Sequence, residues 1–478
     1  MLQTMNNIRF ISALAGFAFL LACNIPKPLA VQRASISIPQ TFGPGADTTT
    51  LASQTWRQYF SDGDLIAIID SALRRNQELV ILEQEMAIRR NEVRARKGEY
   101  LPFLGIGSAA GLERTPRYTR NGAVEEGLPV KGTRTFPDPL GDVQLGAALS
   151  WEVDVWKKLR NARQAAAFRY LNSVEGKRFA VTRLVAEVAA SYYEWQGLFT
   201  TLGIIDQNIS LQSNALEGVR QQKESAKVTQ LAVNRFEAQL LHTRALQYEV
   251  KQRMIEAENR LRFLSGNPAL TLKPMSGAFS SLSPGSGQFG VPAQLLRNRP
   301  DIRQAEFALK AAQLDVKSAR AAFLPSVRIT AGLGFQAFNP VFLLNPASLA
   351  AQAAGDLVAP LVNRNAISAA YLSANAQQVQ TAVAYEQRIL NAYVEVLNEV
   401  ARLDNFSRNY QTKEQEVEIL LNSVSIANSL FNSARADYIE VLTTQREALE
   451  AKLDLVDIKL RQMEAKVNLY RALGGGWQ

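Results

Sequence analysis

Few residues in this chain have side chains suited to catalysis or metal binding. Its 478 residues include one cysteine, Cys23, and one histidine, His242. A single Cys excludes a disulfide within the chain and any zinc or iron–sulfur site built from several thiolates. A single His cannot supply a multi-histidine metal site and leaves little room for a His-dependent triad. We therefore expect His242 to be an ordinary surface or packed residue, and the chain to be no enzyme and to hold no metal or cofactor.

Cys23 stands where a covalent lipid could be attached. Residues 1–22 contain no acidic residue and end in an apolar run of signal-peptide length, too short to span a bilayer as a helix. The run closes with Leu20-Leu21-Ala22-Cys23. This tetrad resembles the lipobox of bacterial lipoproteins, in which cleavage leaves the cysteine as an acylated N-terminus. Because Asn24 follows instead of Asp, the resemblance implies the outer membrane, with an N-acyl and an S-diacylglycerol group on Cys23.

Charged side chains are the remaining candidates for a functional role. The chain has 53 Lys and Arg against 44 Asp and Glu, a formal net charge of +9, which would suit nucleic acid or an anionic membrane surface. Basic and acidic residues are interleaved, without a run of five basic residues. We interpret the charge as a solvated surface and expect no nucleic-acid partner. With 47% hydrophobic and 20% charged residues, the chain is neither disordered nor collagen-like.

Four segments alternate apolar residues with small or polar ones, the period expected of β-strands. They cover 104–112, 143–155, 327–336 and 349–361. Alternation over about ten residues is typical of outer-membrane strands with one side facing lipid, although a half-buried soluble sheet gives the same pattern. In a membrane the other side would line a water-filled lumen, and its charged members would be Glu152, Asp154, Arg328 and Asp356. Simple solvation of a polar face is the alternative for these four residues.

Long helical segments account for much of the remaining chain. No Gly or Pro occurs from Asn363 to Leu473, and apolar residues recur there at helical spacing. At 1.5 Å per residue, the stretch 363–431 alone would extend roughly 100 Å, too far for a compact domain of this size. Its counterpart in the first half covers 157–224, followed by 228–264. An extended bundle or coiled coil is therefore expected.

Each pair of long helices must reverse direction where small and polar residues interrupt the pattern. We expect these reversals at Ser225–Thr229 and Asn432–Asp437. Charged residues repeated around an axis at such a tip could form a selectivity ring or a gating network. The gate candidates are Arg435, Asp437 and Tyr438, and the candidates for partner contact at the first reversal are Lys227 and Thr229. An ordinary helix N-cap is equally open for Asp437.

The sequence contains two copies of one unit. Leu73–Leu79 aligns with Leu296–Ile302 at a spacing of 223 residues, and the Leu-Pro pairs at 101–102 and 324–325 share that spacing. Each copy is expected to form a helix, two strands and two long helices. The resulting prediction is a signal peptide at 1–22, a lipidated segment at 23–61, a first repeat at 62–266, a Gly-, Pro- and Ser-rich linker at 267–290, and a second repeat at 291–478.

Four strands cannot close a barrel by themselves. An open strand edge in lipid would leave backbone groups unpaired, and bacterial barrels have at least eight strands. If the strands lie in a membrane, two or more copies must therefore share one barrel, and a closed cyclic ring is the simplest symmetry.

Three motifs in order resemble those of the TolC-like outer-membrane efflux channels, and in particular their lipoprotein branch, the NodT-type outer-membrane factors. They lie at Ser150–Trp156, at 291–306 and at Ala472–Trp477. The resemblance implies a trimer with a 12-stranded barrel, four strands from each chain, continued by a long α-helical barrel across the periplasm. It further implies an exit duct for drugs or metal ions that docks with a periplasmic adaptor protein and an inner-membrane transporter, commonly of the resistance-nodulation-division class.

Two positions depart from the family pattern. Relatives often have a Gly-containing step after the Trp-Glu-x-Asp motif, where this chain has Trp156-Lys157-Lys158. They usually have a Gly before the last helix, where this chain has Ala434, and Asp437 stands one position away from the Asp of some relatives. The first departure concerns the local turn, and the second concerns the gating role of the tip.

Two other functions remain open at this stage. The same fold could be the exit duct of a type I protein secretion system. A lipid-anchored coiled-coil scaffold without a pore would also use the anchor and the helices. The secretion duct differs from the efflux channel in its cargo, and the scaffold differs from it because it conducts no ions.

Overall fold

A computed structural model describes residues 25–27, 37–42, 49–129, 135–283, 289–360, 362–433 and 435–478. The signal segment, Cys23 and Ala434 lie outside these ranges. The chain divides into two compact units, and each takes residues from both sequence repeats. The first unit combines Ala87–Leu171 with Phe307–Val383, and the second combines Ala34–Met86, Asn172–Glu306 and Ala384–Gln478.

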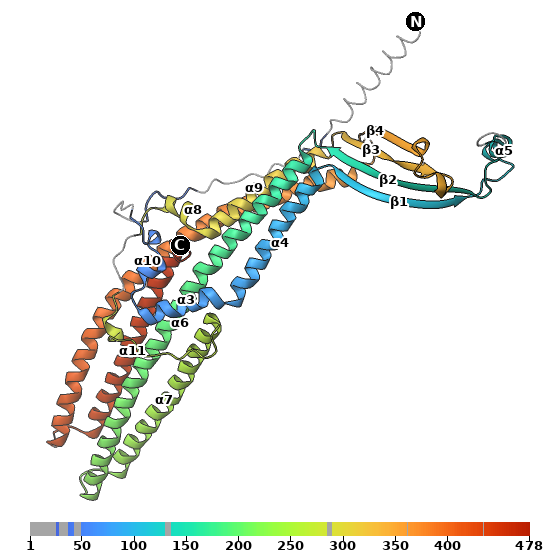
Figure 1. Cartoon of the computed structure of the whole chain (residues 1–478). Helices are drawn as coiled ribbons and strands as arrows, with labels where there is room; N and C mark the ends of the chain where they lie inside the picture. The colour runs from blue at the N-terminus through green and yellow to red at the C-terminus, as the bar shows by residue number, and fades with distance from the viewer. Residues whose placement is uncertain are drawn as a thin grey trace. The chain divides into compact units, whose positions relative to one another are not determined.

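The first unit contains one antiparallel sheet in the order β1-β2-β3-β4 (Figure 1). All four predicted strands are present, as β1 (Phe103–Glu113), β2 (Leu140–Val153), β3 (Ser326–Ala337) and β4 (Leu349–Val358). Each repeat contributes one hairpin, and β2 pairs with β3 to join them. The loop between β1 and β2 carries the short helix α5 (Arg120–Gly127). The tertiary pairing therefore unites two segments that lie far apart in the sequence.

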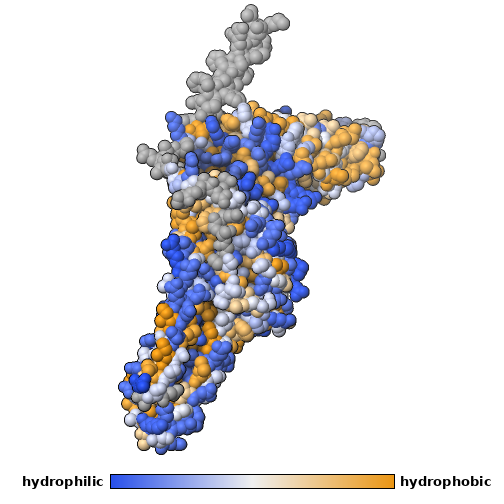
Figure 2. Space-filling model, turned by 90° about the vertical axis from the view of Figure 1, so that its left-hand side faces the viewer, coloured by the Kyte–Doolittle hydropathy of each residue, from blue (hydrophilic) through white to orange (hydrophobic). Residues whose placement is uncertain are grey.

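Strand register separates the sheet into an apolar and a polar face. Glu152 pairs with Arg328, which pairs with Asp356, so these three residues share one face. The opposite face carries alternating apolar residues, among them Ile106, whose exposed fraction is 83%. Figure 2 shows hydrophobic residues exposed on the surface that the sheet forms. An apolar face of this extent requires a covering, either lipid or another protein.

Four helices run from one unit into the other along the chain. They are α4 (Gln77–Tyr100), α6 (Lys158–Glu224), α9 (Pro300–Ala321) and α10 (Asn365–Asn432). Helices α6 and α10 contain 67 and 68 residues, and the length of α10 agrees with the absence of Gly and Pro noted in the sequence. Within the described residues, no helix combines the length and the apolarity needed to cross a bilayer.

The second unit is built on antiparallel helix pairs. Helix α6 is followed by α7 (Gln230–Ser265), and α10 by α11 (Tyr438–Ala472), with both reversals at the predicted positions. Gln462 of α11 donates to the Ser407 hydroxyl of α10 at 2.9 Å, and the Lys413–Asp454 ion pair fixes the same register further along. Helix α3 (Gly63–Arg75) packs beside α7. The remaining helices of this unit are the short α2 (Trp56–Tyr59) and α8 (Leu295–Asn298).

An aromatic cluster anchors the segment before α3 to the helix pairs. The ring of Tyr59 stacks on that of Tyr470 at a centroid distance of 4.1 Å, and Phe60 meets Tyr470 edge-on. The Tyr470 hydroxyl donates to the Gln54 carbonyl at 2.7 Å. Buried stacked rings with paired hydroxyls contribute both apolar burial and orientation. The core of the second unit therefore includes residues that precede the first long helix.

Candidate functional site: the polar sheet face and the helix reversals

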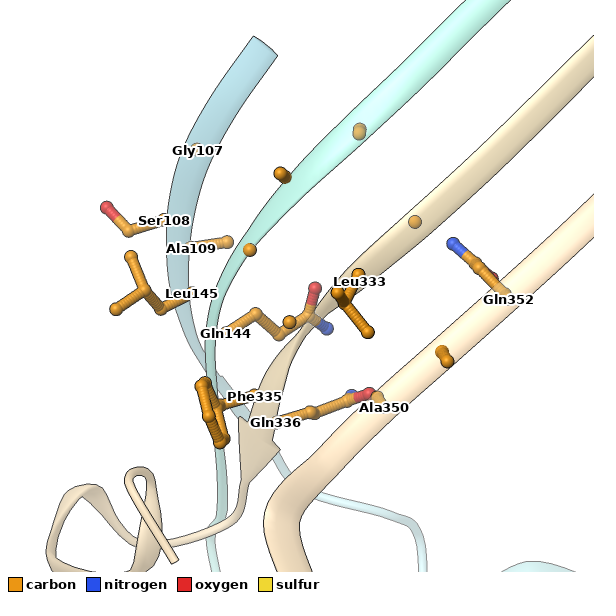
Figure 3. Close-up of a pocket in the computed structure, with 16 residues that line it drawn as sticks. Gly107, Ser108, Ala109, Gln144, Leu145, Leu333, Phe335, Gln336, Ala350 and Gln352 are labelled. Atoms are coloured by element: carbon orange, nitrogen blue, oxygen red, sulfur yellow. The ribbon is translucent and has the colours of Figure 1, made fainter. Parts of the chain in front are cut away.

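The polar face of the sheet is lined mainly by small residues and glutamines. In Figure 3, Gln144 and Gln336 extend to one side of their strands, and Leu145 and Phe335 extend to the other. Asp142 accepts hydrogen bonds from the amides of Gln144 at 2.7 Å and Gln336 at 3.0 Å. This face can therefore offer neutral hydrogen-bonding groups to a solute without large side chains in its way.

Two glycines on this face bring the backbones of β2 and β3 together. Gly146 pairs with Gly334. A Cβ atom added to Gly334 would lie 2.5 Å from the Leu145 carbonyl oxygen and 2.6 Å from the Gly146 Cα. Real Cβ atoms do not approach other atoms as closely as this, so only glycine fits at position 334. Glycines at such positions allow a sheet to curve.

Charged residues occupy one end of the polar face. Arg328 and Asp356 are exposed at paired positions of β3 and β4. Glu152, on β2, accepts a hydrogen bond from the Lys158 ammonium in the first turn of α6. The structure thus brings three of the four predicted lining residues onto one face.

The prediction for Asp154 is wrong. Strand β2 ends at Val153, and the Asp154 side chain is only 2% exposed. Its carboxylate accepts hydrogen bonds from the backbone N–H groups of Leu159 at 3.0 Å and Arg160 at 2.9 Å, and from the Arg160 side chain. A carboxylate is favoured there because the first helical turn has unpaired N–H groups and a positive dipole end. Asp154 therefore caps α6 and does not face water.

The departure at Lys157 leaves the turn intact. Lys157 has φ = 60°, in the left-handed region that favours glycine. Asn363, which precedes α10 in the second repeat, has φ = 53°. Both residues have a positive φ shortly before a long helix, so Lys157 takes a conformation that a glycine would adopt more easily.

The two helix reversals lie side by side. Val228 from the first and Tyr438 from the second pack against one hydrophobic cluster that includes Phe236. Both reversals close in the same way, because the Lys227 N–H donates to the Gln222 carbonyl and the Arg435 N–H donates to the Leu430 carbonyl, each at 2.9 Å. This backbone bond is typical of a helix C-cap.

The predicted tip residues differ in their surroundings. Tyr438 is half-buried by the hydrophobic cluster, whereas Lys227, Thr229, Arg435 and Asp437 are exposed. Asp437 occupies the N-cap position of α11, but its side chain makes no cap hydrogen bond within the described part of the chain. The carboxylate is thus available to a partner, while a gating role for it stays a prediction.

A buried ionic cluster was not identified from the sequence. The Arg299 guanidinium donates to Asp301 at 3.0 and 2.9 Å, to Glu395 at 2.7 Å and to the Ala472 carbonyl at 2.8 Å. Arg471 also donates to Glu395, at 2.9 Å. Burial by itself lowers the pKa of Arg299, but its bonds to Asp301 and Glu395 raise it overall. The sequence signal was the Arg299-Pro300-Asp301 motif, which contains one partner, whereas Glu395 and Ala472 come from distant helices.

Comparisons with known proteins match the chain over nearly its whole length. The family model described as "Outer membrane efflux protein" matches residues 68–267 and 291–475. The solvent efflux pump outer membrane protein SrpC of Pseudomonas putida is 26% identical over 453 residues, which is 94% of each chain. The probable outer membrane lipoprotein SilC of Salmonella typhimurium is 26% identical over 464 residues, 96% of this chain and 97% of that protein.

The fold is also found in a solved structure. The cation efflux system protein CusC of Escherichia coli is 26% identical over 455 residues, 94% of this chain and 95% of CusC. A crystal structure of CusC superimposes with a TM-score of 0.82 at 24% identity, covering 94% of this chain and 99% of that one. The predicted channel fold is thereby confirmed. The chain belongs to the outer membrane efflux protein family, and it is an outer-membrane channel component of an efflux pump.

Proposed function

We propose that three copies of this chain form one closed channel that serves as a passive exit duct for small toxic solutes. The observation that carries the proposal is the four-stranded sheet, whose outer strands β1 and β4 are both unpaired on one side within the described chain. Strand edges in lipid must be paired, and a bacterial barrel has at least eight strands. Two such sheets would reach this minimum, and three would give the 12 strands that the sequence resemblance implies, in either case with cyclic symmetry.

Helices α7 and α10 support association with further copies. Leu241, Tyr248 and Ile255 are exposed at seven-residue intervals on α7, and Tyr248 has an exposed fraction of 70%. Ile419 and Ile426 are exposed at the same interval on α10. Apolar residues seven apart lie along one stripe of a helix, at positions where a neighbouring helix can pack. The proposed neighbour of each α7 is the α10 of the next copy.

The proposed surroundings of the channel follow the sequence resemblance. Cys23 would carry a lipid that anchors the chain in the outer membrane, a proposal supported by the name of the relative SilC as an outer membrane lipoprotein. A periplasmic adaptor would dock at the exposed reversals around Lys227 and Arg435, and an inner-membrane transporter would supply the energy. Palmitate labelling that is lost in the Cys23→Ser variant tests the anchor.

The proposed cargo is a small solute, because the names of SrpC and CusC refer to solvent efflux and cation efflux. Deletion of the gene in its host, followed by growth on solvents, drugs and metal salts, distinguishes these classes. Sensitivity to chemically diverse organic compounds would indicate a multidrug or solvent duct, and sensitivity to metals alone would indicate a metal duct. Unchanged sensitivity to every compound, together with retention of a secreted protein, would overturn the efflux assignment.

Channel formation is tested on the purified full chain. We expect a particle with the mass of three chains and discrete conductance steps in a planar bilayer. A monomer without conductance would contradict the proposal and favour a scaffold.

A further inference from the structure

The second unit contains a pocket that is lined by helices and the linker, with no residue of the sheet among its lining. It has a volume of about 330 Å³ and is formed by α6, the linker, α10 and α11 of one chain. Its apolar walls include Phe199 of α6, Phe279 of the linker and Val456 of α11. Pockets from roughly 300 Å³ upward hold small organic ligands, so its volume suits a small molecule.

The linker is fixed over the helices by specific contacts. The buried Gln196 amide donates to the Lys273 carbonyl at 3.0 Å and accepts from the Met275 N–H at 3.1 Å. Phe279 is buried, and its ring lies 3.6 Å from the position that a Cβ on Gly197 would take. The linker wall is therefore in place before any ligand arrives, which lowers the entropic cost of binding.

The pocket also contains a lysine that is largely buried and forms no ion pair with any described residue. Lys459 is 5% exposed and lines the pocket, and its ammonium lies 4.6 Å from the centre of the Tyr410 ring. It makes no hydrogen bond or ion pair with any residue that the structure describes. Burial lowers the pKa of Lys459, an effect that the charge of Glu414 opposes and that of Lys466 reinforces.

Other buried charges in the described chain are paired. Arg299 contacts two carboxylates, Glu175 contacts Arg178 and Arg303, and Glu399 contacts Arg402. Removing a charge from water is costly unless an opposite charge or hydrogen bonds replace the solvent. Among the described residues, the direct contact of the Lys459 ammonium is the face of the Tyr410 ring, which attracts a cation more weakly than a paired carboxylate does, and Glu414 acts on it only beyond ion-pair distance.

We propose that this pocket binds a small apolar carboxylate, an aromatic or medium-chain aliphatic acid. Its carboxylate accepts a hydrogen bond from the Lys459 ammonium, and its apolar body packs against Phe199, Phe279 and Val456. The charge supplies the selectivity for an acid, and the walls supply the apolar burial. The inference is independent of conduction, because the pocket belongs to a single chain.

The probe is 4-phenylbutyrate, with 4-phenylbutanol and 4-phenylbutylammonium as neutral and cationic analogues. Calorimetric titration of the full chain in nanodiscs is expected to give a Kd of about 1 mM or tighter for the acid and at least tenfold weaker binding for both analogues. Lys459→Met keeps the side-chain length and should weaken acid binding about tenfold or more. Val456→Trp should abolish binding by filling the pocket with the charge intact.

Lys251→Met is the matched control. Lys251 lies 208 residues before Lys459, the same spacing that separates Gly266 from Gly474, and it is exposed on α7. Acid binding should be unchanged in this variant, and a thermal melt of each variant reports whether it folds. Equal binding of the acid to wild type and Lys459→Met, equal binding of acid and alcohol, or no binding up to about 10 mM would each overturn the proposal.

Discussion

Asn76 and Arg299 make the same contact in the two halves of the chain. The Asn76 side chain donates to the carbonyl of Leu264 near the end of α7 at 3.1 Å, and Arg299 donates to the carbonyl of Ala472 at the end of α11 at 2.8 Å. The two donors align in the sequence repeat, and so do the two helix ends. Both side chains satisfy carbonyls that a helix end leaves without a backbone partner. The second copy has added charge to this contact, because Arg299 also binds Asp301 and Glu395.

Substitution of Arg299 should therefore cost more stability than substitution of Asn76. Arg299→Met leaves Asp301 and Glu395 without their shared cation and should lower the free energy of unfolding by about 3–5 kcal/mol. Asn76→Ala removes a neutral hydrogen bond and should cost about 1–2 kcal/mol. Denaturant unfolding followed by fluorescence measures both. Arg297→Ala is the control because Arg297 is exposed, and a loss for Arg299→Met no larger than for this control would refute the role of the cluster.

Lys157→Gly should stabilise the protein. Lys157 holds a left-handed backbone that costs a non-glycine residue about 1 kcal/mol, and glycine adopts it freely. Its exposed side chain has no bond within the described chain that the change would remove. We expect a gain of about 0.5–1 kcal/mol. Asn363→Gly is the comparison, with a smaller gain because Asn tolerates this conformation better. A loss of stability in Lys157→Gly would contradict the assigned turn.

Gly334→Ala should weaken the sheet, whereas Gly107→Ala should not. An added Cβ at Gly334 would overlap the backbone of β2, but one at Gly107 meets no atom within 4 Å. Overpacking of this kind costs about 1–3 kcal/mol. The measurement is the fraction of protein that assembles into the proposed trimer after insertion into the outer membrane. Equal assembly of the two variants would show that the Gly146–Gly334 contact does not limit the sheet.

Asp437→Ala should change conductance without changing stability. Asp437 makes no cap hydrogen bond in the described structure, so the free energy of unfolding should stay within about 0.5 kcal/mol of wild type. If a ring of these carboxylates and their cationic partners holds the tip closed, the variant should show a larger mean conductance in planar bilayers.

Asp62→Ala provides the contrasting case. Asp62 caps α3 through the N–H groups of Asp64 and Leu65 and also accepts from the Tyr192 hydroxyl. Its loss should cost about 1–2 kcal/mol with no effect on conductance. If the conductance of Asp437→Ala equals that of wild type, Asp437 has no gating role and serves only as the residue at which α11 begins.

The sequence by itself determined the elements that depend on local patterns. Period-two alternation located all four strands, the absence of Gly and Pro located α10, and the sequence repeat placed α6 as its counterpart in the first half. The reversals followed from small and polar residues at Ser225 and Asn432. These signals are local because strand alternation and helix continuity depend on near neighbours in the chain. Asp154 was misplaced because alternation continued past the end of β2, and only the position of α6 shows that its carboxylate is bound.

Tertiary structure alone decided which distant residues meet. The pairing of β2 with β3 joins the two repeats into one sheet, and the partners of Arg299 include Glu395, 96 residues away. The pocket at Lys459 depends on a Gly-, Pro- and Ser-rich linker that Gln196 holds in place, and no periodicity in the linker indicates where it docks. Such contacts are fixed by packing and by the pairing of buried polar groups, which arise only when separate elements come together.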